Sequence, residues 1–204
     1  MGLLSASVSI TRYMVNGKIE DPFFENVGAA LNKHVIPDIE GEQQDKAVGW
    51  TSFERPYEPG FEGSTWVIGQ YAVFSLRIDK KSVPAKVVKK NFEIECRKRL
   101  AESGREFLGR EEKKQIKEQI HNVLLTRVPA VPNVYDLIWN YEEGTLWFMA
   151  SQKGAREELE TLFLQSFNVP LIPMFPFTVA ELAAGLTPEQ IDVLATTAPT
   201  RFAE

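Results

Sequence analysis

The segment between Pro84 and Pro129 constrains the fold more than any other part of the sequence, because its apolar residues repeat with helical spacing. In its first half an apolar residue occupies every fourth position, at Val88, Phe92, Cys96 and Leu100. Gly104 and Gly109 interrupt this pattern. A second helix is expected from about Arg110, with the inward residues Ile116, Ile120, Val123 and Leu124. We therefore expect two consecutive helices that end before Pro129.

Patterns typical of strands flank this helical pair on both sides. Alternation predicts a strand over Leu4–Ile10, and β-branched and aromatic residues predict others at Val48–Trp50, within Ser64–Ile78, and at Leu171-Ile172. A hairpin is expected over Val134–Ser151, turning at Glu142-Glu143-Gly144. Further helices are expected over 21–34, from a Ser151 cap to Phe167, and after Pro176, with a start at Thr187. This order favours an α+β fold with antiparallel or mixed sheets and a long charged helical pair over a doubly wound parallel sheet.

A chain of 204 residues is expected to fold as a single unit. Within that unit we allow two lobes, a sheet-and-helix body of residues 1–82 plus 130–204 and a basic helical segment of residues 83–129. The end of the chain, Thr200–Glu204, is expected to be unstructured.

The net charge of −5 hides a segregation of charge along the chain. Fourteen basic and seven acidic residues lie between Lys80 and Arg127, whereas the rest of the chain holds nine basic and twenty-one acidic residues. The field at a surface depends on the charges within about one Debye length, roughly 8–10 Å. The basic segment therefore favours a polyanionic partner even though the whole chain is mildly acidic.

Sequence signals for catalysis, cofactors and membranes are weak. The chain has no glycine-rich dinucleotide or phosphate loop and no nucleophile elbow. His34, His121 and Cys96 stand outside any motif, and we interpret them as structural residues. We therefore expect no enzyme, no cofactor and no metal site. A single cysteine, no long apolar run and no basic region before the apolar N-terminal residues indicate a cytoplasmic protein without a membrane segment or secretory signal.

A nuclease is the enzymatic alternative, because it needs clustered carboxylates to hold Mg²⁺. Asp136, Glu142 and Glu143 are the nearest candidates. Adjacent residues on a strand point to opposite faces, so Glu142 and Glu143 are poorly placed to share one ion.

The basic residues of the helical pair gather on defined faces. At about 100° per residue, Lys86, Lys90 and Arg97 fall within roughly 40° of one another on the first helix. On the second helix Arg110, Lys114 and Lys117 cluster beside the apolar stripe. Such side chains contact phosphates without reading bases. The alternative is a solvated helix pair with local ion pairs to residues such as Glu93, Glu111, Glu112 and Glu118, and the residues alone leave both interpretations open.

Several short segments, in order, resemble the RdgC family of recombination-associated proteins, and the similarity extends from about Val48 to Met174. The segments are Val48-Gly49-Trp50, Val83-Pro84-Ala85-Lys86-Val87-Val88, Leu124-Leu125-Thr126-Arg127, Leu137-Ile138-Trp139, an acidic Ala-Arg-Glu-Glu-Leu helix and Val169-Pro170-Leu171-Ile172-Pro173. Order and spacing carry the resemblance, since no single segment is diagnostic.

The resemblance implies a protein that binds DNA without sequence preference. It also implies a ring-shaped homodimer that admits duplex DNA through a positively lined hole, restrains RecA-driven strand exchange and associates with the nucleoid. RecA-pathway proteins are then possible partners. The residues expected to contact phosphates are Lys86, Lys90, Arg97, Lys113, Lys114, Lys117 and Arg127.

Two departures from the family bear on assembly. Family members usually continue well beyond the position of Glu204, and they often carry an aromatic residue where this chain has Val128-Pro129-Ala130. An open clamp, a different oligomer and a monomer are therefore alternatives to the ring-shaped homodimer. A further alternative is a protein-interaction module without DNA binding, which uses the aromatic residues Phe53, Tyr57 and Phe61 of a loop rich in proline and glycine.

Overall fold

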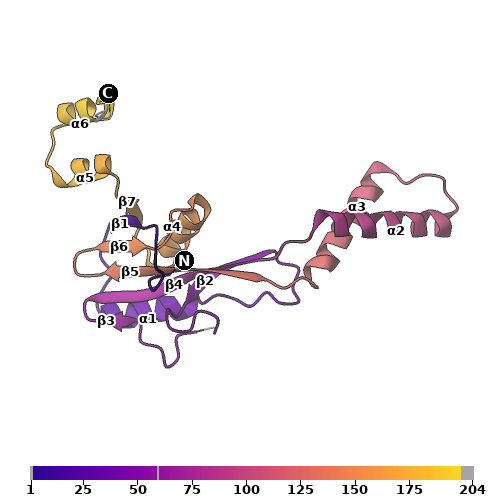
Figure 1. Ribbon diagram of the computed structural model, residues 1–204, viewed down its shortest axis with the longest axis horizontal. Coiled ribbons are helices and arrows are strands. Elements are labelled where there is room, and N and C mark those ends of the chain that lie inside the picture. The colour runs from indigo at the N-terminus through magenta and orange to yellow at the C-terminus, as the bar shows by residue number, and fades with distance from the viewer. Residues whose placement is uncertain (1, 59, 199–204) are drawn as a thin grey trace. The chain divides into compact units, whose positions relative to one another are not determined.

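The structure is a computed structural model that describes residues 2–58 and 60–198. In this part of the chain seven strands occur, at Thr11–Val15 (β1), Lys46–Thr51 (β2), Val67–Ile68 (β3), Tyr71–Lys80 (β4), Val131–Asn140 (β5), Thr145–Phe148 (β6) and Leu171–Pro173 (β7). The helices are Phe23–Lys33 (α1), Ala85–Ser103 (α2), Arg110–Leu125 (α3), Lys153–Phe167 (α4), Pro176–Ala183 (α5) and Pro188–Thr196 (α6). These elements confirm the predicted α+β class (Figure 1).

The strands pair in the order β2-β4-β5-β6-β1-β7, with β3 joined to β4. The described residues fall into two units, one of residues 2–30, 66–74 and 135–198 and one of residues 31–58, 60–65 and 75–134. Strands β4 and β5 each run through both units. The predicted lobes, with their boundaries at residues 83 and 129, stay a prediction.

The core of the first unit lies where one face of strands β1, β5 and β6 meets α4. Leu137 of β5 lies opposite Phe148 of β6, and Leu146 of β6 lies opposite Tyr13 of β1. All four side chains are buried, as alternation along each strand requires when one face is covered. Helix α4 adds buried side chains at Ala155, Leu159, Leu162, Phe163 and Phe167.

Tyr13 links β1 to α4 through a polar contact. Its hydroxyl donates a hydrogen bond to Glu160 Oε1 at 3.0 Å. Burial raises the pKa of Tyr13, and the nearby negative charge of Glu160 raises it further, so the phenol stays protonated as a donor.

The predicted strand over Leu4–Ile10 is wrong. These residues form turns, bends and irregular chain, and Leu4 and Ile10 are exposed. The strand begins at Thr11, where pairing with β6 starts, and β7 joins on the other side from Tyr13. Alternation alone does not make a strand, because its backbone groups also need a pairing partner.

Most other predicted elements are confirmed near their expected bounds. Both helices of the basic segment and the β5–β6 hairpin are present, and Thr187 caps α6 by accepting a hydrogen bond from Gln190 N at 3.4 Å. Two details are wrong: Gln152, not Ser151, precedes α4, and Val123 is exposed while Leu125 is buried instead. Thr200–Glu204 lie outside the described residues. Within the described part, no helix combines the length and apolarity that a membrane crossing needs.

Candidate nucleic-acid interface

Helices α2 and α3 form a hairpin in the second unit (Figure 1). Pro84 precedes α2 with φ −62°, a backbone angle that its ring sets in advance. Gly104 ends α2 in the left-handed region at φ 65°, which a residue without a Cβ adopts readily. Gly109 then precedes α3. Proline and glycine residues therefore mark both ends of α2 and the start of α3.

Apolar and polar contacts join the two helices. Val88 of α2 and Ile116 of α3 are buried, and complete burial of a side chain such as Ile116 contributes about 1.5–3 kcal/mol. The guanidinium of Arg99 donates from Nε to Glu95 Oε1 and from Nη2 to Gln119 Oε1, both at 3.1 Å. This arginine is engaged within the hairpin and is not free to contact a ligand with all its donors.

Lys81 ties the base of the hairpin to the rest of the second unit. Its side chain is buried, and Nζ donates hydrogen bonds to Glu42 O at 2.9 Å and to Leu125 O at 3.2 Å. Leu125 is the last residue of α3, whose carbonyl has no partner within the helix. Lys81 therefore positions α3. It belongs to the basic segment by sequence but is not part of the charged surface.

A shallow hollow on α2 brings four basic side chains together. Its volume is about 370 Å³, and its walls are Lys86, Lys89, Lys90, Glu93, Ile94 and Arg97. It contains the three residues that helical spacing placed on one face, and it adds Lys89. We call this the basic hollow.

Most of the positive charge at the basic hollow is unpaired. Lys89 Nζ lies 4.0 Å from Glu93 Oε1, a distance that marks a weak exposed ion pair. Among the residues that the structure describes, no carboxylate oxygen lies within 4.0 Å of a Lys86, Lys90 or Arg97 side-chain nitrogen. The local ion pairs expected of a purely solvated helix are therefore few on this face.

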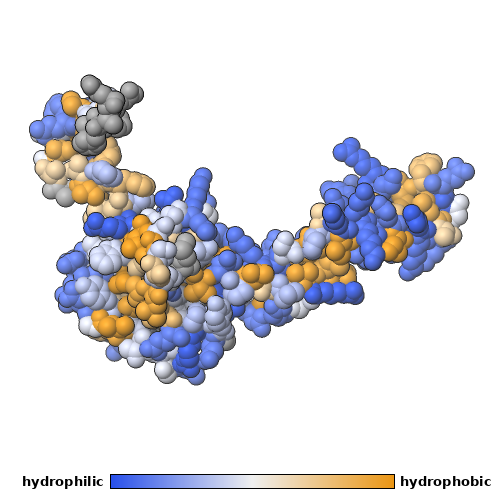
Figure 2. Space-filling model, viewed as in Figure 1, coloured by the Kyte–Doolittle hydropathy of each residue, from blue (hydrophilic) through white to orange (hydrophobic). Residues whose placement is uncertain are grey.

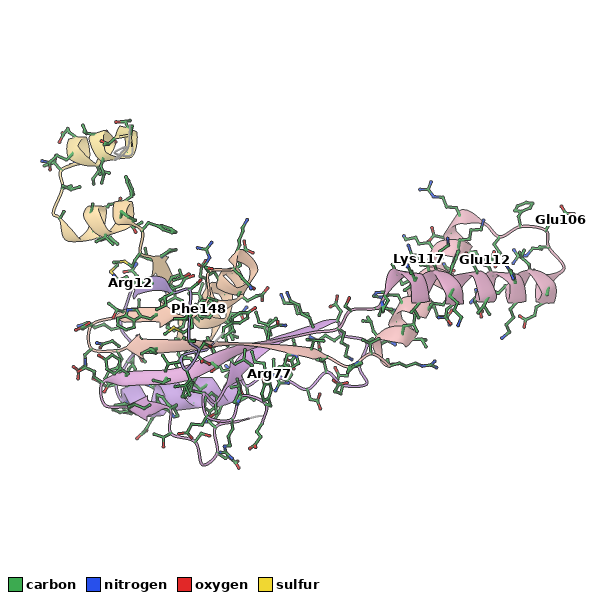
Figure 3. The ribbon with its side chains drawn as sticks, viewed as in Figure 1. Arg12, Arg77, Glu106, Glu112, Lys117 and Phe148 are labelled. Carbon is green, nitrogen blue, oxygen red and sulfur yellow. The ribbon has the colours of Figure 1, made fainter. Side chains whose placement is uncertain are left out.

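The predicted residues of α3 spread over several surfaces. Lys113, Lys114 and Lys117 are exposed, and Lys117, labelled on the hairpin in Figure 3, lines a separate apolar hollow with residues of α2. Arg127 lines a third hollow, with Glu95 and Gln119. The structure therefore gathers Lys86, Lys90 and Arg97 and leaves the other four predicted residues apart from them.

Figure 2 shows hydrophilic residues projecting from the hairpin with hydrophobic residues between them. Near its tip, Arg105 Nη2 pairs with Glu112 Oε1 at 2.8 Å. Glu111 and Glu112 occupy the first turn of α3, where the helix dipole favours negative charge. The positive potential should therefore be weaker at this end of the hairpin than at the basic hollow.

The apolar hollow and Lys81 are the features that sequence reasoning missed. A lysine next to another lysine gives no sign of burial. The hollow depends on which residues of α2 and α3 face each other, and their periodicity leaves that pairing open.

The carboxylates proposed for the nuclease alternative are dispersed. Asp136 is buried in the middle of β5, where Oδ2 accepts a hydrogen bond from Leu3 N at 2.7 Å. Glu142 and Glu143 are exposed in the turn after β5, and Asp136 to Asn140 alone spans about 13 Å at the rise of a strand. Among the described residues no group of three or more histidine, cysteine, aspartate or glutamate side chains could hold a metal ion.

The aromatic loop proposed as a partner surface is only partly exposed. Tyr57 is exposed, Phe53 is half-buried and Phe61 is buried. Thr51 Oγ1 donates to Pro56 O at 3.1 Å and holds the loop against β2. The three rings therefore do not form one exposed patch.

Comparison with protein families identifies a match that covers most of the chain. A family model described as "RdgC: Putative exonuclease, RdgC" matches residues 10–187, which is more than half of the chain. No curated protein matches the chain.

Proposed function

The chain belongs to the RdgC family of recombination-associated proteins, and on this premise we propose that it binds DNA without sequence preference through the α2–α3 hairpin. The observation that carries the proposal is the basic hollow, where Lys86, Lys90 and Arg97 lie together without paired carboxylates among the described residues. Polyanion binding needs such unpaired and accessible cations.

The dimensions of the basic hollow suit a phosphate backbone. Arg97 lies eleven positions after Lys86, which is roughly 16 Å along a helix. Phosphates of one duplex strand follow one another at about 3.4 Å along the axis, so this face spans about five of them. Lysine and arginine side chains on an exposed helix face position a duplex but carry no sequence information by themselves.

We also propose where the protein acts and in which oligomeric state. The protein acts in the cytoplasm at the nucleoid, as a homodimer that grips duplex DNA and limits RecA-dependent strand exchange. It acts by occupying DNA and not by chemical turnover. Lys113, Lys114, Lys117 and Arg127 then provide secondary phosphate contacts around the basic hollow.

The first test is a titration against a labelled duplex of random sequence at several salt concentrations. We expect a linear log–log salt dependence with a slope of about −0.9 for each phosphate contacted, and hence about −3 or steeper. The mass of the protein, recorded in the same buffers, reports the dimer. A flat salt dependence would contradict a phosphate interface.

The second test reverses the charge of the basic hollow with K86E, K90E and R97E combined. We expect the affinity to fall by at least about tenfold for every duplex sequence, because each lost cation removes one counterion-release contribution. The matched control combines K18E, K33E and K153E, which changes the net charge equally at exposed lysines outside α2 and α3. Equal weakening by both triple variants would show that only net charge matters.

The description of the family as an exonuclease favours a second candidate function. It is tested by incubating end-labelled DNA with Mg²⁺ or Mn²⁺ and following the release of nucleotides. Turnover that is lost in D136A would establish this function and overturn the proposal of binding alone. D136N is the companion variant, because it keeps an acceptor for the Leu3 amide.

A further inference from the structure

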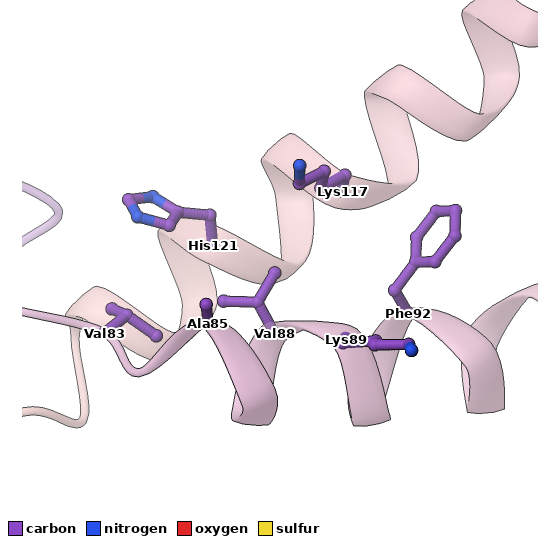
Figure 4. Close-up of a pocket in the computed structure, with 7 residues that line it drawn as sticks. All are labelled: Val83, Ala85, Val88, Lys89, Phe92, Lys117 and His121. Atoms are coloured by element: carbon purple, nitrogen blue, oxygen red, sulfur yellow. The ribbon is translucent and has the colours of Figure 1, made fainter.

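An apolar hollow of about 480 Å³ lies between α2 and α3, on a different side of α2 from most of the basic hollow. Its apolar walls are Val83, Ala85, Val88 and Phe92, and its polar walls are Lys89, Lys117 and His121 (Figure 4). The volume falls within the range of natural ligand sites, roughly 300–1,000 Å³.

The chemistry of this hollow differs from that of a phosphate site. The charged DNA backbone would gain little binding free energy from walls of valine, alanine and phenylalanine. A large apolar side chain, in contrast, gains about 25 cal/mol of free energy for each Å² of apolar surface that it buries. Two adjacent helices also leave a groove that a third segment can fill, which is a common mode of peptide recognition. The walls therefore favour a protein side chain as the occupant.

The charged groups around the apolar hollow indicate which charge the partner should carry. Lys89 of α2 and Lys117 of α3 border the apolar walls from opposite helices, and His121 adds a third basic group. The only ion pair of these groups within the described residues is the long one between Lys89 and Glu93, at 4.0 Å. An apolar anchor flanked by carboxylates would therefore meet complementary groups on both sides.

We propose that this hollow binds an acidic segment of a partner protein, which inserts one aromatic or large aliphatic side chain between Val88 and Phe92. Carboxylates beside that anchor pair with Lys89 and Lys117. This inference does not rest on DNA binding, since the apolar walls are separate from the residues that carry the proposed function.

The two ligands should exclude each other. Lys89 lines both hollows, and Lys117 is both a wall of the apolar hollow and an expected phosphate contact. A bound acidic segment would neutralise these charges and repel DNA at short range. An acidic partner would thereby displace the protein from DNA.

The test uses a short fluorescent peptide with one phenylalanine between aspartates and measures its binding to the full chain by anisotropy. Two control peptides replace the phenylalanine by alanine or the aspartates by asparagines. We expect each replacement to weaken binding by at least about tenfold, the scale of a buried anchor residue. Equal binding of the alanine peptide would overturn the proposal, because charge alone would then explain the affinity.

The site is tested with A85W, which fills the hollow from the first residue of α2. A101W is the matched control, because Ala101 is exposed near the other end of the same helix and does not line the hollow. We expect A85W to weaken peptide binding at least about tenfold and A101W to leave it unchanged. If A85W does not fold by circular dichroism, V83W fills the same hollow from outside the helix.

Other occupants give distinct outcomes. Binding of an oligo(dT) strand that A85W abolishes, without binding of the phenylalanine peptide, would assign the hollow to an unstacked base and overturn the proposal. A dimer mass that A85W reduces to a monomer would assign it to a second copy of the chain. Displacement of labelled duplex by the phenylalanine peptide, and not by its alanine form, would support the proposal.

Discussion

At the residue scale, Gly49 explains why a Gly-Trp pair occurs in the second strand. The chain at residues 34–36 passes beside β2, where Ile36 N donates to Trp50 O at 3.0 Å and Trp50 N donates to His34 O at 2.8 Å. A Cβ on Gly49 would overlap the backbone of Ile36 and lie 2.8 Å from the carbonyl carbon of Val35. The glycine therefore permits a close approach of two backbones, and the neighbouring Trp50 is fully buried.

We expect G49A to lower the free energy of unfolding by about 1–3 kcal/mol, because a backbone clash cannot be relieved by rotating a side chain. Urea denaturation measures the change. The matched control is G154A in α4, where an added Cβ meets no atom within 4 Å. Its stability should equal or exceed that of the parent, since alanine favours a helix over glycine by about 0.5–1 kcal/mol. Equal stability of both variants would contradict the close approach.

At the element scale, the position of the α2–α3 hairpin depends on Lys81. The two hydrogen bonds from its ammonium join the last carbonyl of α3 to Glu42 O, and a positive charge at this end of a helix also complements the helix dipole. A buried lysine is tolerated only with such partners.

We expect K81M to lower the free energy of unfolding by about 1.5–3 kcal/mol, the range for hydrogen bonds made by a charged group. Methionine keeps the apolar stem and removes the donors. K80M is the matched control, because Lys80 is the neighbouring exposed residue, and its effect should stay within about 0.5 kcal/mol. If chemical denaturation gives the two variants the same stability, Lys81 does not hold the hairpin.

The helices were predictable from the sequence because their signals are local. Pro84, Gly104 and Gly109 act on the backbone of their own neighbours, and the stripe from Val88 needs no distant partner. The prediction of a strand over Leu4–Ile10 was wrong because a strand needs hydrogen-bond partners, and pairing with β6 starts only at Thr11 and with β7 only at Tyr13.

The candidate site was predictable in part for the same reason. Lys86, Lys90 and Arg97 lie on one helix, so helical geometry alone brings them together. The apolar hollow is lined by Phe92 of α2 and Lys117 of α3, and no pattern within one helix specifies that these residues share a hollow. Sequence reasoning therefore found the surface that belongs to one element and missed the one that two elements share.

At the scale of the whole molecule, the chain passes from one unit to the other within regular strands. Strands β4 and β5 each contribute residues to both, and Asn133 Nδ2 of β5 donates to Ile78 O of β4 within the second unit. Each unit therefore ends within a strand whose backbone continues directly into the other unit. Shared strands favour cooperative unfolding.

We expect hydrogen exchange followed by mass spectrometry to give the same opening free energy for β2, in the second unit, and β6, in the first, within about 1 kcal/mol. Helix α6, which buries no residue, is the internal reference and should exchange much faster. Exchange of β2 well before β6 would mean that the second unit opens alone. The basic hairpin would then be carried by a unit that unfolds independently, and DNA bound there would slow exchange in β2 without slowing it in β6.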